Sequence, residues 1–167
     1  IDQDVFINDN YAINPWTIGV ATFDGLDETG YPHDWSASGA TGWADDLTSK
    51  PIDLSFYSIG DSVYISFFYQ AGGLGNAPES DDSLVLEFYL PSTSSWQSFW
   101  GINGFTSDEW YYEHLILDDP TFFQNGFQFR FRSYGSLMGS LDHWNLDYVY
   151  LNETRSVADT LMNDWAF

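Results

Sequence analysis

The chain has 167 residues, which suits one domain, and it carries four Lys and Arg residues against 25 Asp and Glu residues, a formal net charge of −21. A field of this sign repels phosphate backbones and anionic lipid surfaces, so nucleic acid and membrane surfaces are excluded as partners, whereas divalent cations are attracted. Aromatic residues make up 20% of the chain, a composition that favours pleated strands.

The location of the protein is predicted from what the sequence lacks. Cysteine is absent, which favours an exported bacterial protein or a reducing compartment. No apolar run approaches the roughly 20 residues of a membrane span, so we expect no membrane insertion. The chain opens at Ile1 without Met or a signal peptide, so we expect the mature or excised part of a longer protein. The predicted location is secreted or on a bacterial cell surface.

Short alternating runs separated by Gly, Asn, Asp, Ser and Pro predict strands joined by turns along the whole chain. The predicted strands cover residues 5–7, 18–23, 52–56, 63–69, 84–89, 96–100, 110–117, 127–131 and 143–151. Residues 24–40 and 71–80 are polar and rich in glycine, which predicts two long loops of the kind that carry function. Residues 156–167 suit either a short helix or a final strand.

The strand predicted at residues 127–131 has the clearest alternation. Phe127, Phe129 and Phe131 point to one face, and Gln128, Arg130 and Arg132 point to the other. Two of the four cations therefore lie side by side. In so acidic a chain we expect them to pair with carboxylates, Glu87 on a neighbouring strand among them, although an arginine pair that binds an anionic ligand has the same pattern.

The number and spacing of the strands predict the fold class. Eight or more short strands without a long amphipathic helix indicate an all-β protein, a two-sheet antiparallel β-sandwich with jelly-roll topology. We expect residues 1–167 to form this single domain, and we expect the isolated domain to be a monomer.

The order of several motifs resembles that of MAM-like jelly-roll domains. These motifs are GWADDLTSKPIDL at residues 42–54, VYISFFYQ at 63–70, the segment 127–134, and LDYV at 146–149. The amino-acid sequences of these motifs are most similar to those of MAM-like domains in large surface proteins of bacteria that use type IX secretion. The resemblance implies adhesion, or carbohydrate or protein binding. The chain departs from the eukaryotic module in lacking its cysteines and in having Tyr148 where that module has a second Asp.

The resemblance also implies a structural calcium ion between an early acidic residue and the last strand. The matching positions are Asp24 and Asp147, and Asp27 and Asp45 are the residues we expect to complete a shell of six to eight oxygens. The alternative is that these carboxylates cap turns. A second acidic group, within residues 76–83, lacks the regular spacing of an EF-hand loop and is predicted to be a solvated loop.

Aromatic residues beside polar stretches are candidates for ligand contacts, because exposed rings stack on the apolar faces of sugars. We predict ligand-binding positions at Trp35, Trp43, Trp110, Tyr112 and Trp144. Core packing is the alternative for most of them, since aromatic side chains bury large apolar areas.

Three functions remain open. The first is a non-catalytic binding or adhesion module for a neutral glycan or a protein partner, with a structural calcium. The second is a spacer or docking domain recognised by secretion machinery. A glycoside hydrolase is the third, since Glu87, Glu109 and Glu113 lie on or beside predicted strands and such enzymes use two carboxylates. With 25 acidic residues some pair is inevitable, and no nucleophile elbow or histidine metal spacing occurs, so we predict no catalysis.

Overall fold

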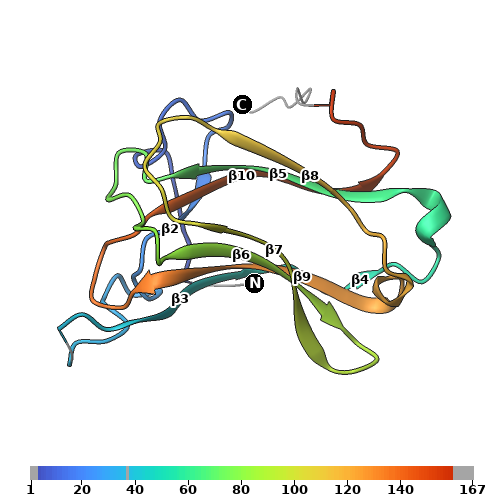
Figure 1. The fold of residues 1–167 in the computed structure, drawn as a ribbon, viewed down its shortest axis with the longest axis horizontal. Helices are drawn as coiled ribbons and strands as arrows, with labels where there is room; N and C mark the ends of the chain where they lie inside the picture. Colours follow the sequence, from blue (N-terminus) through green and yellow to red (C-terminus); the bar gives the residue numbers. More distant parts are fainter. Residues whose placement is uncertain (1–3, 37, 160–167) are drawn as a thin grey trace.

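The computed structural model describes residues 4–36 and 38–159, and these residues form two β-sheets stacked face to face (Figure 1). Apart from two short 3-10 turns, η1 (Ile59–Asp61) and η2 (Pro120–Phe122), the regular structure consists of strands. The strands are β1 (Phe6–Asn8), β2 (Val20–Phe23), β3 (Thr41–Thr48), β4 (Ile52–Asp53), β5 (Val63–Ala71), β6 (Ser83–Leu90), β7 (Ser95–Asn103), β8 (Tyr111–Ile116), β9 (Asn125–Ser136) and β10 (Trp144–Glu153).

The connectivity confirms the predicted jelly roll. One sheet, called here the β10 sheet, has the order β1-β2-β10-β5-β8. The other, the β9 sheet, has the order β3-β9-β6-β7, with β4 paired to β9. All strand pairs are antiparallel, and from β2 onward the chain crosses repeatedly between the sheets. Strands that are distant in sequence, such as β2 and β10, therefore become neighbours.

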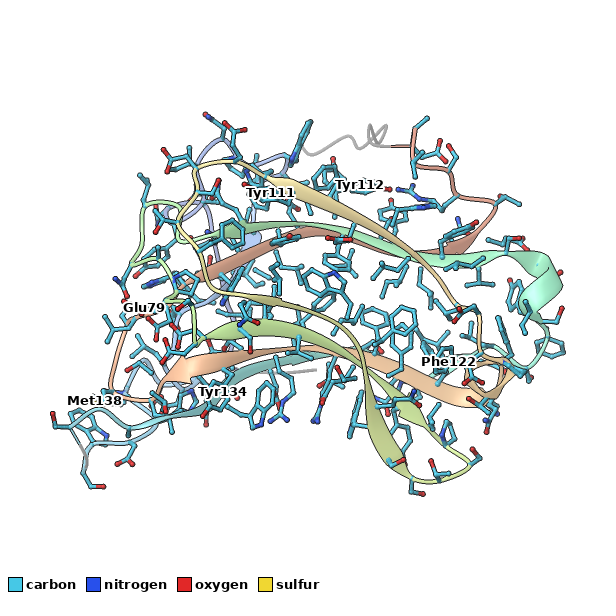
Figure 2. The ribbon with its side chains drawn as sticks, viewed as in Figure 1. Glu79, Tyr111, Tyr112, Phe122, Tyr134 and Met138 are labelled. Carbon is cyan, nitrogen blue, oxygen red and sulfur yellow. The ribbon has the colours of Figure 1, made fainter. Side chains whose placement is uncertain are left out.

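The core lies between the two sheets and is largely aromatic (Figure 2). The β9 sheet contributes Phe88 and Phe131, each with none of its surface exposed, and the β10 sheet contributes Phe67. The Phe67 and Phe131 rings meet edge to face with centroids 4.8 Å apart. Full burial of one such side chain stabilises the fold by roughly 1.5–3 kcal/mol, so these alternating inward positions hold the layers together.

Three segments differ from their sequence-based predictions. Residues 41–48 are not among the predicted strands, whereas β3 occupies them as an edge strand of the β9 sheet. The strand predicted at 52–56 is shortened to β4, because the chain turns where Ser55 bonds the Asp53 carboxylate. In the C-terminal segment, residues 156–159 form a turn closed by Asp159, and the rest of the predicted helix or strand lies outside the described residues.

Candidate functional site

The outer face of the β9 sheet carries an ordered array of polar and aromatic side chains. Leu84, Leu86 and Phe88 of β6 are buried in the core, so the residues between them point outward. The pairing register aligns outward residues from neighbouring strands in four rows. The rows are Trp43, Tyr134 and Ser83; Asp46, Arg132, Val85 and Gly101; Thr48, Arg130, Glu87 and Ser98; and Gln128, Tyr89 and Trp96. We call this surface the β9 face.

The centre of the β9 face is a lattice of two arginines and two carboxylates. Arg130 Nε lies 2.6 Å from Glu87 Oε2, and Arg132 Nε donates to Asp46 Oδ1. The second contacts cross over, from Arg130 to Asp46 at 3.7 Å and from Arg132 to Glu87 at 4.0 Å. The four charges cancel, which makes the centre of the β9 face neutral in a chain of net charge −21. The predicted pairing of Arg130 with Glu87 is confirmed.

Each arginine also packs on a tryptophan. The guanidinium of Arg132 lies 4.4 Å from the centroid of Trp43, and that of Arg130 lies 4.2 Å from the centroid of Trp96. Such cation–π contacts orient the indole rings. Trp43 is 44% exposed, so a large part of its ring remains open to solvent. The two tryptophans lie in the outermost rows, whose backbone positions are six residues, or about 20 Å, apart along β9. The two rings lie closer together than these rows, because each ring packs on an arginine of an inner row.

Two segments extend beyond the β9 face at its ends. The turn between β6 and β7 projects from one end, and the segment between β2 and β3, described at residues 24–36 and 38–40, projects from the other, on the same side of the sheet (Figure 1). Tyr134, close to the second end, packs edge to face on Trp43 with centroids 5.4 Å apart. The β9 face is therefore an elongated surface with aromatic rings near both ends and charged groups between them.

A β-bulge in β3 decides which of two neighbouring aspartates belongs to the β9 face. The register shifts between Trp43 and Asp46, so both of these residues point outward although they are three positions apart. Asp45, between them, has none of its surface exposed. Its carboxylate accepts a 2.9 Å bond from Gly25 N–H and lies 3.2 Å from His33 Nε2.

Asp24, directly after β2, and Asp45, in β3, form a buried acidic pair. Burial is the main cause that raises the pKa of Asp45 to about 7, and the Asp24 charge adds to it. Burial also raises the pKa of Asp24. Gly25 adopts a φ of +73°, and a Cβ there would lie 2.8 Å from the Gly139 carbonyl oxygen, so only glycine fits beside Asp45. The pair anchors one end of the segment between β2 and β3.

The four predicted calcium ligands do not converge on one site, although Asp24 and Asp45 lie together. Asp147 follows Leu146, which pairs with Ala21, so Asp147 lies level with Val20 and four residues away from Asp24 along β2. That separation corresponds to about 13 Å. Asp147 accepts bonds from both the N–H and the hydroxyl of Thr17. Asp27 closes a turn by bonding Thr29 and Tyr31, the alternative stated above for these carboxylates.

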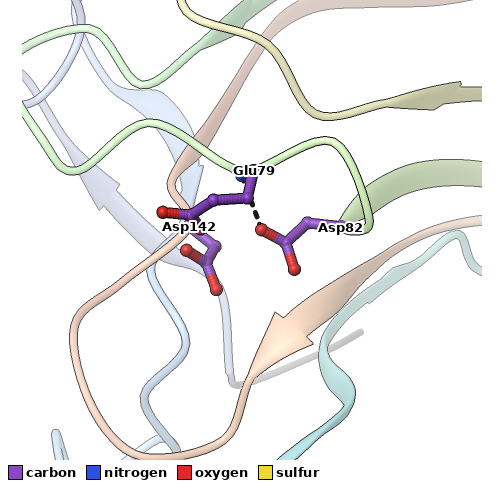
Figure 3. A group of neighbouring side chains, drawn as sticks. All are labelled: Glu79, Asp82 and Asp142. Atoms are coloured by element: carbon purple, nitrogen blue, oxygen red, sulfur yellow. Dashed lines mark hydrogen bonds between the residues drawn. The ribbon is translucent and has the colours of Figure 1, made fainter. Parts of the chain in front are cut away.

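A different group of carboxylates does converge, between the loop before β6 and the loop before β10. Ligand oxygens of Glu79, Asp82 and Asp142 lie within 4.8 Å of one another (Figure 3). Backbone N–H groups of Glu79 and Ser136 hold one oxygen each of Asp82 and Asp142, at 2.6 and 2.7 Å. Burial raises the pKa of Asp82 to about 6 and raises that of Asp142. These oxygens suit a hard cation or shared protons.

The predicted ligand-binding aromatic residues are spread over the molecule. Trp43 belongs to the β9 face. Trp35 is 74% exposed in the segment between β2 and β3, where it packs on Tyr31. Trp144 has none of its surface exposed and contacts Tyr69 and Phe105 in the core, so the prediction of a surface contact is wrong for this residue.

Trp110 and Tyr112 lie on the side of the β10 sheet. Trp110 is half-buried and lines a cleft of about 470 Å³ together with Trp16. Tyr112 points to the outer face of the β10 sheet, where it packs on Phe68 with centroids 4.8 Å apart (Figure 2). Tyr89, Trp96 and Tyr134 were not predicted as members of the β9 face. Alternation with buried neighbours was the available signal for Tyr89 and Tyr134, whereas the neighbours of Trp96 along β7 are exposed.

The carboxylates considered for glycoside hydrolysis do not form a pair across one cleft. Glu87 is held by arginines on the β9 face. Glu113 belongs to the other sheet and pairs with Phe67, so it points between the layers, where burial raises its pKa and Trp100 bonds to it. Glu109 precedes β8 in the cleft beside Trp110.

Comparison with known proteins identifies the fold. No protein-family model matches the chain, and no curated protein matches it in sequence. A crystal structure of a carbohydrate-binding module specific for non-crystalline cellulose, CBM28, matches with a TM-score of 0.50 and 16% identity, over 90% of this chain and 82% of the module. A family 16 carbohydrate-binding module matches with a TM-score of 0.48 and 13% identity, over 90% and 86% of the two chains.

A third structure, xylanase 10C from Cellvibrio japonicus in complex with xylopentaose, has a TM-score of 0.40 and 14% identity, with 93% of this chain matched to 29% of the xylanase. The CBM28 similarity confirms the jelly-roll sandwich. In the part of the chain that the structure describes, no helix has the length and apolar character needed to cross a membrane.

Proposed function

We propose that this chain is a non-catalytic carbohydrate-binding module and that the β9 face is its binding surface. The observation that carries the proposal is the pair of arginine-backed tryptophans, Trp43 and Trp96, at opposite ends of a neutral hydrogen-bonding lattice. Indole rings held in place by neighbouring groups provide flat apolar platforms for sugar rings. The lattice between them offers donors and acceptors at fixed positions.

The lattice favours an uncharged, extended glycan. Arg130 and Arg132 present guanidinium donors, while Asp46 and Glu87 present carboxylate acceptors, so sugar hydroxyls find partners of both kinds. Mutual pairing already neutralises these groups, and an anionic sugar would have to displace a carboxylate from an arginine. The two tryptophans lie on the opposite edge strands β3 and β7, so a glycan of a few sugar units that contacts both rings crosses the strands over the arginine lattice.

The fold and the state of the acidic residues support binding rather than hydrolysis. The similar CBM28 structure is described as specific for non-crystalline cellulose, which makes amorphous glucans the first polymers to test. Glu87 and Asp46, the carboxylates of the β9 face, are both engaged by arginine. A hydrolase needs one carboxylic acid that releases its proton to the leaving group, and an arginine-paired carboxylate is a poor donor.

Affinity gel electrophoresis tests the proposal. The protein is run through native gels containing hydroxyethylcellulose, barley β-glucan, xylan, glucomannan or alginate, beside a matched gel without polymer. We expect retardation by at least one neutral polymer and none by alginate. Trp43→Ala and Trp96→Ala should each clearly weaken it, while Phe56→Ala, a substitution of an 86% exposed aromatic residue outside the four rows of this face, should not. Failure of every neutral polymer would refute glycan binding and favour a spacer or docking domain.

A structural calcium ion remains part of the proposal, with Glu79, Asp82 and Asp142 as the residues that could hold it. Calcium bound only by the folded state at a hundred times its Kd would add about 2.7 kcal/mol of stability. A thermal melt in calcium and in chelator measures this gain, and Asp142→Asn should remove it. Equal melting temperatures in calcium and in chelator would show that the fold holds no stabilising calcium ion. A surface location, MAM-like kinship and type IX secretion stay predictions.

A further inference from the structure

The cleft that Trp16 and Trp110 line lies on the opposite side of the molecule from the β9 face. The N-terminal segment before β2 and the segment before β8 form its walls. Trp16 packs on Phe68, an outward residue of β5, with ring centroids 5.1 Å apart, so the cleft borders the outer face of the β10 sheet. The residues lining its volume of about 470 Å³ are Ile13, Asn14, Trp16, Asp108, Glu109 and Trp110.

A buried glutamine joins the two walls of this cleft. Gln70 has none of its surface exposed, and its side-chain oxygen accepts the N–H of Ile13 at 2.9 Å. Its amide nitrogen donates to the carbonyl oxygens of Ile13 at 3.1 Å and of Asp108 at 2.8 Å. Trp110 Nε1 donates to the same Ile13 oxygen at 2.8 Å. The two loops are therefore held in one relative position before any ligand arrives.

Asp147 holds the other half of the N-terminal wall. Its carboxylate accepts the N–H of Thr17 at 3.1 Å and the Thr17 hydroxyl at 2.8 Å, which ties the chain down directly after Trp16. The indole of Trp16 is still 48% exposed. The residue predicted as a calcium ligand thus acts here as a positioning residue for an open aromatic ring.

We infer that this cleft is a second saccharide site, which takes a short segment of a neutral glycan. The inference rests on the proposed function for its ligand class and not for its location. Two indoles supply apolar walls, and the exposed carboxylates of Asp108 and Glu109 accept hydrogen bonds from hydroxyls. None of the described residues that line the cleft is Lys or Arg, so an anionic sugar is repelled by Asp108 and Glu109. Its volume falls within the roughly 300–1,000 Å³ of small-molecule sites.

The two sites face away from each other, so one molecule can hold two polymer chains. Linked sites raise apparent affinity for a long polymer through effective concentration, and sites on opposite faces cross-link separate chains. The wild-type protein should therefore raise the viscosity of a hydroxyethylcellulose solution. Variants that retain one site should bind the polymer without thickening it.

Isothermal titration calorimetry distinguishes binding in this cleft from binding on the β9 face, because each site can be removed by its own substitutions. The Trp43→Ala/Trp96→Ala double variant is titrated with cellotetraose, xylotetraose, mannotetraose and the cationic tetramer of glucosamine. We expect one molar equivalent of at least one neutral tetrasaccharide to bind, with at least a tenfold loss when Trp16→Ala is added. Because Trp16 packs on Phe68, Glu109→Ala serves as a second variant on an exposed side chain, with melting curves as the folding control.

The possible failures are distinguishable. If the wild type binds a neutral tetrasaccharide and the double variant binds none, the cleft is not a saccharide site, and the β9 face stands. If the double variant binds as the wild type does and Trp16→Ala abolishes binding, the cleft stands and the proposed location on the β9 face is wrong. Binding of the glucosamine tetramer alone would replace the inferred site by one for cations. No binding of any probe by any form would overturn both.

Discussion

The outer faces of the two sheets both carry aromatic side chains, but these side chains differ in how far neighbouring segments cover them. On the β10 sheet, Phe68 points outward and is only 4% exposed, because Trp16, Tyr112 and Tyr148 pack against it. On the β9 sheet, Trp43 points outward and is 44% exposed, with an arginine beside its ring. An outward aromatic residue therefore serves packing where other segments cover it and remains available for binding where they do not.

The largest expected effect of breaking this comparison is on stability. Phe68→Ala should lower the free energy of unfolding by about 3–5 kcal/mol, since it removes a buried ring and leaves a cavity. Trp43→Ala should cost less than about 1 kcal/mol, because much of that ring is already solvated. Urea denaturation of both variants measures the difference. Equal losses would mean that the exposed tryptophan is a packing residue as well.

A pH titration sharpens the contrast between the interior and the surface of β3. The pKa of Asp45 is raised to about 7 in the fold, against 3.8 for the unfolded chain. Between these two pH values Asp45 is therefore protonated in the folded state and ionised in the unfolded chain. The stability contributed by this group is complete below pH 4 and is lost as pH rises to about 7, with a slope of up to about 1.4 kcal/mol per pH unit. The raised pKa of Asp82, about 6, acts in the same direction.

Asp45→Asn should flatten the stability profile across this window, measured as urea midpoints from pH 4 to pH 8. Because Asp45 points inward while Asp46 belongs to the β9 face, glycan retention by this variant should match that of the wild type. A profile as steep as that of the wild type would assign the pH dependence to another group.

The arginine lattice should affect binding more than stability. Arg130→Leu leaves Glu87 and Asp46 with fewer partners, and we expect a loss of about 1–2 kcal/mol in stability, small because all these side chains are partly solvated. Arg130→Lys keeps the charge but not the planar fork of donors. It should restore most of the stability, as judged by thermal melts, whereas its gel retardation should stay as weak as that of Arg130→Leu. Full retardation of Arg130→Lys would show that charge alone suffices.

The smallest effect is expected at Trp35. This residue is 74% exposed and its ring contacts another exposed ring, Tyr31, so Trp35→Ala should change stability by no more than about 0.5 kcal/mol. Trp35 is a predicted ligand contact on the segment that borders the β9 face. Trp35→Ala should therefore weaken retardation by long polymers, but less than Trp43→Ala does. An equal or larger weakening would move the centre of the site to this segment.

Much of the β9 sheet could be predicted from alternation alone. Phe127 and Phe131 lie inside, and Arg130 and Arg132 lie outside, as the sequence indicates. No strand was predicted around Asp45, and simple alternation would place it on the same side as Trp43. A bulge reverses that side, and a bulge leaves no clear mark in a single sequence.

The sites that combine distant segments could not be predicted residue by residue. Asp142 joins Glu79 and Asp82 only once β9 and β10 are placed beside the loop before β6. Trp96 becomes part of the β9 face through a register that pairs it with Tyr89. The sequence around Gln70 indicates only a strand residue. Its role in holding two loops together depends on hydrogen bonds to Ile13, which is 57 positions away, and to Asp108, which is 38 positions away.

Nuclear magnetic resonance of the tryptophan indole N–H groups tests the central claim most directly. The protein, labelled with ¹⁵N, is titrated with an oligosaccharide of the polymer that retards it, and the signals are assigned by single substitutions. We predict that the Trp43 and Trp96 signals shift at the lowest ligand concentrations, while the signal of the buried Trp144 stays fixed. Saturable binding that leaves both Trp43 and Trp96 unmoved would contradict the assignment of this face as the carbohydrate-binding surface.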